Sequence, residues 1–102
     1  MKRTDCSLNS LIKECHRVAK SKGWWDEKRN EGELIALMHS ELSEALAAMR
    51  NYGTKDNIAE ELADCCIRIF DYCGAKDINL GKALFKKIEY NKTRSYHHGK
   101  EF

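Results

Sequence analysis

Apolar residues recur at helical period along four stretches of the chain, and no stretch alternates as a strand would. The spacing predicts helices over 8–22 and 31–51, a third that starts at Thr54 or Asp56 and ends by Gly74, and a fourth over about 79–94. Ser7 is placed to cap the first helix, and Gly23 follows its end. Four amphipathic helices joined by short connectors predict an all-α protein, an antiparallel four-helix bundle.

Each predicted helix has an apolar stripe that we expect to form the core. The stripe of the fourth helix is Leu80, Ala83, Leu84 and Ile88. In a chain of this size, four short amphipathic helices leave part of their apolar surface exposed to solvent. We therefore expect the bundle to be completed by oligomerisation.

Two acidic pairs interrupt this apolar pattern: Glu41-x-x-Glu44 and Glu61-x-x-Asp64. Residues three apart share a helix face. Glu41 falls inside the apolar stripe of its helix, where an unpaired charge costs several kcal/mol. A bound divalent cation would remove that cost, and carboxylate oxygens suit Mg²⁺ or Mn²⁺.

A charged, solvated helix face is the alternative interpretation of the second pair. Asp64 and Arg68 are spaced as an i,i+4 ion pair, and Asp71 continues the same series. Because Glu41 lies within an apolar arc and a second acidic pair follows on the next helix, we favour the metal site.

The residues around these acids resemble a known family. Residues 37–46 read LMHSELSEAL, residues 59–64 read AEELAD, and the connector between the pairs spans 45–60. The run KIEYNKTR at 87–94, followed by His98-Gly-Lys100, completes the likeness. The chain from about Leu11 to Phe102 is similar to the MazG-like all-α nucleoside triphosphate pyrophosphohydrolases.

This resemblance implies an Mg²⁺-dependent enzyme, with Mn²⁺ as the alternative metal. It implies hydrolysis of an NTP or dNTP between the α- and β-phosphates, in nucleotide-pool house-cleaning. The metal ligands and catalytic residues implied are Glu41, Glu44, Glu61 and Asp64, with Glu44 or Glu61 as the candidates for activating water. It also implies a homodimer or homotetramer.

Substrate-binding candidates lie in two other segments. Lys87, Asn91 and Arg94 share one face of the fourth helix and could grip phosphate and sugar oxygens. A solvated basic face is their alternative, and His98 and Lys100 are weaker candidates on the tail. Trp24 and Trp25, in the first connector, could stack on a base or plug one end of the bundle.

Length and charge narrow the class of protein. The 102 residues predict one domain over 1–102, with 1–6 and 95–102 flexible or extended. A net charge of +2 argues against a nucleic-acid polymer as partner. Residues 31–64 carry eight acids and two bases, whereas 81–102 carry six bases and two acids. Residues 1–30 carry eight bases and four acids. An acidic middle with basic ends suits a metal-bound polyphosphate, and ordinary helix surface charge is the alternative.

Cellular location is inferred from two further features. Five cysteines without paired spacing fit a reducing cytosol. No signal peptide pattern and no apolar run of about 18 residues occur, so we expect a cytoplasmic protein that spans no membrane.

Two other functions have to be compared with this pattern. A non-catalytic oligomeric module that binds a nucleotide or partner keeps the same helices without turnover. A di-iron carboxylate bundle needs Glu-x-x-His on two helices, and no histidine of this chain has a glutamate three positions before it.

Overall fold

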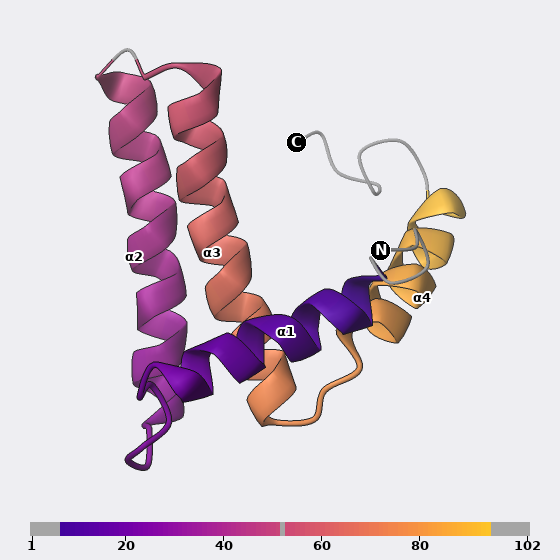
Figure 1. The fold of residues 1–102 in the computed structure, drawn as a ribbon. Coiled ribbons are helices and arrows are strands. Elements are labelled where there is room, and N and C mark those ends of the chain that lie inside the picture. Colours follow the sequence, from indigo (N-terminus) through magenta and orange to yellow (C-terminus); the bar gives the residue numbers. More distant parts are fainter. Residues whose placement is uncertain (1–6, 52, 95–102) are drawn as a thin grey trace.

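A computed structural model describes residues 7–51 and 53–94 of the chain. Those residues form four helices, α1 (Leu8–Ser21), α2 (Glu31–Arg50), α3 (Lys55–Ala75) and α4 (Leu80–Lys92), and no strand (Figure 1). The prediction of an all-α fold with four helices is confirmed, and each helix ends within about two residues of its expected bound. None of the helices in the described ranges is long and apolar enough to cross a membrane.

Side-chain caps explain why the helices begin where they do. The side chains of Ser7, Asn30 and Asn79 each accept a hydrogen bond from the backbone N–H three residues later. Thr54 and Asn57 form a reciprocal capping box at the start of α3. The caps satisfy backbone donors that the first turn of a helix leaves free, so the boundaries were readable from the sequence.

The centre of the fold is an antiparallel hairpin of α2 and α3, and α1 crosses the lower end of α3 (Figure 1). Five apolar side chains are buried where these three helices meet: Ile12, Leu34, Ala45, Cys65 and Cys73. The core is therefore small and concentrated at the α1 end of the hairpin and along the α2–α3 seam.

Gly74 allows α1 and α3 to approach closely. A Cβ atom at this position would lie 2.6 Å from Cβ of His16 and 3.2 Å from the carbonyl oxygen of Ile12. A larger residue would have to push α1 away, which justifies a glycine within α3 despite its poor helix propensity.

α4 differs from the sequence-based expectation. It lies beside the N-terminal half of α1, away from the α2–α3 hairpin (Figure 1). Asn9 links the two helices, because its side chain donates to Asn79 Oδ1 at 3.1 Å and accepts from the Gly81 N–H at 3.2 Å.

The predicted core face of α4 is wrong within a single chain. No α4 residue is buried, and Leu84 and Ile88 are 43 % and 53 % exposed. Helical period identified the apolar stripe correctly, but period does not say whether the surface that covers a stripe belongs to the same chain.

Candidate functional site

The hairpin brings the two acidic pairs into one region, because α2 carries Glu41 and Glu44 and α3 runs antiparallel beside it with Glu61 and Asp64. Glu41 and Glu61 are partly buried at the seam, and Glu44 and Asp64 are exposed. This placement follows the sequence-based expectation that Glu41 lies inside the apolar arc.

The carboxylates lie close enough to influence one another. Partial burial, followed by the negative charges of Asp64, Glu44, Glu41 and Glu60, raises the pKa of Glu61 above its ordinary value. The four acids therefore form a field of excess negative charge across the two helices, which we call the carboxylate group (Glu41, Glu44, Glu61 and Asp64).

Arg68 pairs with a different acid from the one expected. Its Nε atom lies 3.5 Å from Oε2 of Glu41 on the neighbouring helix, and the Arg68 and Glu41 side chains are 26 % and 20 % exposed. The expected i,i+4 pair with Asp64 is not among the ion pairs of the described residues. Arg68 thus belongs to the carboxylate group's surroundings and not to a separate solvated face.

Trp24 lies next to this ion pair. The Arg68 guanidinium carbon is 3.9 Å from the centroid of the Trp24 ring, and the Arg29 guanidinium carbon is 5.1 Å from it. Arg29 also donates to the Trp24 carbonyl at 3.4 Å and faces Glu33 at 3.8 Å, while its buried Nε has no hydrogen-bond partner in the described part of the chain. Arg68 therefore contacts both the Trp24 ring and the Glu41 carboxylate.

An apolar hollow of about 260 Å³ opens on Trp24. Its walls include Val18 and Ala19 of α1 and Ile67 of α3. A flat aromatic group could enter this hollow and stack on the indole ring. The hollow is therefore compatible with the expectation that Trp24 stacks on a base.

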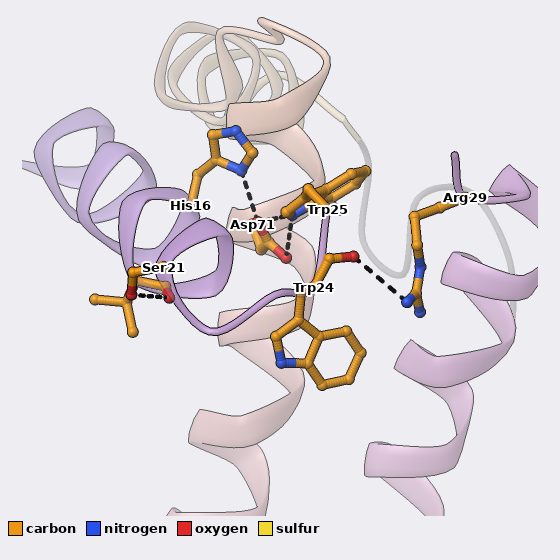
Figure 2. A network of polar contacts seen from close by, with 7 residues as sticks. His16, Ser21, Trp24, Trp25, Arg29 and Asp71 are labelled. Carbon is orange, nitrogen blue, oxygen red and sulfur yellow. Dashed lines mark hydrogen bonds and ion pairs between the residues drawn. The ribbon is translucent and has the colours of Figure 1, made fainter. Parts of the chain in front are cut away.

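Trp25 points in another direction, toward α1 and α3 (Figure 2). Its Nε1 donates to both oxygens of Asp71, at 2.9 Å and 3.1 Å, and His16 Nδ1 lies 2.8 Å from Asp71 Oδ1. The His16 and Trp25 rings meet edge to face at 5.5 Å. Asp71 is only 8 % exposed. We call these three residues the Asp71 network.

The alternative interpretation, in which Asp71 continues a solvated charged face, is wrong for this residue, because Asp71 is buried. A signal was present, because Asp71 is flanked on both sides by Ile69, Phe70, Tyr72 and Cys73. A lone acid in such a run is typical of a buried carboxylate with donors supplied from elsewhere in the fold. The partners themselves, 55 and 46 residues away, could not be read from that run.

The α4 candidates are not brought to the carboxylate group within one chain. Lys87 and Arg94 both lie near Tyr90, with Nζ and Cζ 5.2 Å and 5.4 Å from its ring centroid. Asn91 is exposed on the same helix. His98 and Lys100 lie outside the described residues.

The carboxylate group fits a hard divalent cation by its chemistry, since its donors are oxygen atoms whose mutual repulsion such an ion would relieve. As the side chains stand, no three His, Cys, Asp or Glu residues in the described ranges converge to hold a metal. Glu41 is turned to Arg68 instead. Metal binding would thus require these side chains to reorient toward one another.

Comparisons with family models, with curated proteins and with solved structures gave no match to this chain.

Proposed function

We propose that the protein is an Mg²⁺-dependent pyrophosphohydrolase of nucleoside triphosphates, of the MazG-like kind. The observation that carries the proposal is the carboxylate group, four acids on the facing helices α2 and α3, where burial and then neighbouring negative charges raise the pKa of Glu61. Concentrated negative charge of this type weakens a helix pair unless a cation offsets it. A metal–polyphosphate complex would supply that cation together with the substrate.

The reaction is hydrolysis at the α-phosphorus. A water oxygen bonds to this phosphorus while its bond to the α–β bridging oxygen breaks, so the products are a nucleoside monophosphate and pyrophosphate. Glu41, Glu44, Glu61 and Asp64 would hold Mg²⁺, which supplies charge neutralisation to the phosphates and acidity to a bound water. Glu44 and Glu61 are the candidates for accepting the water proton.

Trp24 and its apolar hollow would receive the base. Trp24 lines the hollow and lies under Arg68, which contacts Glu41, so a base at Trp24 would have its phosphates directed toward the carboxylate group. Trp25 is engaged by Asp71, and we assign it a structural role at the base of the connector.

A second copy of the chain completes the protein in this proposal. Four apolar side chains share one exposed face of α2: Ile35, Leu42, Leu46 and Met49. A second hairpin laid on this face would bury them and form a four-helix arrangement between two chains. Phosphate binding by Lys87, Asn91 and Arg94 likewise needs α4 of a second copy, because their own α4 lies away from the hairpin.

Light scattering at micromolar concentration tests the assembly. We expect a dimer or larger for the wild type and a monomer for Leu46→Asp, with Ser10→Asp at an exposed position of α1 as the control for one added acid. A monomeric wild type would overturn this part of the proposal and leave the reaction to be tested separately.

Product analysis over a panel of nucleoside triphosphates, with Mg²⁺ and with EDTA, tests the reaction. We expect monophosphate and pyrophosphate from the wild type, lost with EDTA and lost in Glu61→Gln. Glu60→Gln is the matched control, since Glu60 is exposed and its charge raises the pKa of Glu61 less than those of Asp64, Glu44 and Glu41 do. Nucleotide binding without any product would favour the non-catalytic module.

A further inference from the structure

Arg68 occupies a position that the proposed reaction does not use. It approaches Glu41 through Nε at 3.5 Å, and it lies over the Trp24 ring at 3.9 Å. Both the guanidinium and the Glu41 carboxylate are largely shielded from water. Water therefore screens the charges of this pair less than those of the exposed pair of Arg17 with Glu14, whose side chains are 67 % and 58 % exposed.

Arg68 and a divalent cation require the same carboxylate. Glu41 is the member of the carboxylate group that lies deepest in the α2 stripe, and it is the one that Arg68 contacts. A guanidinium at this distance repels a second positive ion that approaches the same oxygens. In this arrangement Glu41 lies against Arg68, and no three acids of the described residues converge as metal ligands.

We propose that Arg68 is the built-in counter-cation of the carboxylate group, that it leaves Glu41 when a divalent cation binds, and that it then offers its N–H groups to the substrate phosphates. The proposal rests on the proposed function for the identity of the phosphate ligand, and on geometry alone for the competition at Glu41.

The Trp24 ring explains why Arg68 would remain nearby after release. Its stacking on the indole does not depend on Glu41, and a stacked guanidinium keeps its N–H donors free in the ring plane. Planar donors of this kind match two phosphate oxygens at once. Arg68 would thereby exchange a carboxylate partner for a phosphate partner without leaving the site.

Calorimetric titration with Mn²⁺, in the absence of nucleotide, tests the competition. We expect Arg68→Met to bind Mn²⁺ roughly tenfold more tightly than the wild type, because one positive charge beside the ion is removed. Arg68→Lys keeps that charge and should bind nearly as the wild type does. Arg17→Met, which breaks the exposed pair on α1, controls for net charge.

Equal or weaker Mn²⁺ binding by Arg68→Met, with its helical circular dichroism intact, would overturn the proposal. If that variant loses helicity, Arg68→Gln serves in its place, since glutamine removes the charge but keeps a polar side chain. These titrations involve no turnover, so they are independent of the product analysis. An enzyme that forms pyrophosphate but shows no Arg68 effect would refute this inference alone.

A second readout follows the release itself. Mg²⁺ should change the tryptophan fluorescence of the wild type, and this change should disappear in Trp24→Phe and in Arg68→Met. With Mg²⁺ saturating, Arg68→Met should bind pyrophosphate several-fold more weakly, whereas Arg17→Met should not. Unchanged pyrophosphate affinity in Arg68→Met would remove the phosphate part of the proposal.

Discussion

Two regions of α3 place their acidic side chains in opposite environments. Near its C-terminal end, Asp71 is buried and both of its oxygens accept hydrogen bonds, from His16 and Trp25. At least two turns closer to its N-terminus, α3 carries Glu61 and Asp64, and the acids Glu41 and Glu44 of α2 act on Glu61. Arg68 pairs with Glu41 there. A carboxylate whose lone pairs are met by the protein holds the fold together, whereas carboxylates with unmet charge are available to a ligand.

Replacing Glu41 should have the largest effect in the carboxylate group. Glu41→Gln is expected to lower Mg²⁺-dependent turnover by about 10²-fold or more, because a metal ligand supplies several kcal/mol of charge stabilisation. The helical circular dichroism should remain. Wild-type turnover in this variant would show that the metal assignment is wrong.

Replacing Asp71 should affect stability instead. Asp71→Ala leaves the His16 and Trp25 donors unpaired in a shielded site, so the free energy of unfolding should fall by about 1–3 kcal/mol. Urea unfolding measures the change, and Mn²⁺ titration of the folded variant should give the wild-type affinity. A large loss of Mn²⁺ affinity without destabilisation would show that Asp71 contributes to metal binding, and the distinction between the Asp71 network and the carboxylate group would be wrong.

Cysteine reactivity should distinguish the interior of α3 from its surface. Burial raises the pKa of Cys65 and of Cys73 above the ordinary thiol value, which keeps both as unreactive thiols at pH 8. The neighbouring Cys66 is exposed. We expect iodoacetamide to modify Cys66 at least about tenfold faster, as read by peptide mass spectrometry. Equal rates at Cys65 and Cys66 would contradict the helix register.

The smallest effect concerns repulsion within the carboxylate group. Glu44→Gln should raise the free energy of unfolding by a few tenths of a kcal/mol at low salt, since it removes one of several like charges. The gain should vanish at high salt, where exposed charges are screened. Destabilisation by this substitution would indicate that Glu44 makes a favourable contact that the charge argument overlooks.

Local signals in the sequence were sufficient for the helices and for the facing acids. Ser7 and Thr54 mark helix starts by a mechanism that needs no tertiary structure, and the acid pairs have a helical spacing. The hairpin then follows from a short connector. Both features depend on residues within a few turns of one another.

Contacts between residues far apart in the sequence could not be predicted in this way. Arg68 had two acids within reach, and only the packing of α3 on α2 selects Glu41 over Asp64. The position of α4 depends on Asn9, about 70 residues earlier, which contacts Asn79 and Gly81. An apolar stripe such as that of α4 predicts a covered face without naming what covers it.

The close crossing at Gly74 depends on a short sequence pattern that can be recognised in other proteins. His16 can reach Asp71 only while α1 lies against α3, and the missing side chain at 74 is what permits that distance. The buried acid and the glycine are separated by one helical turn, as Asp-x-x-Gly, with the histidine and tryptophan nine residues apart upstream. Distant relatives that share this architecture should preserve this combination even where the rest of their sequence has drifted.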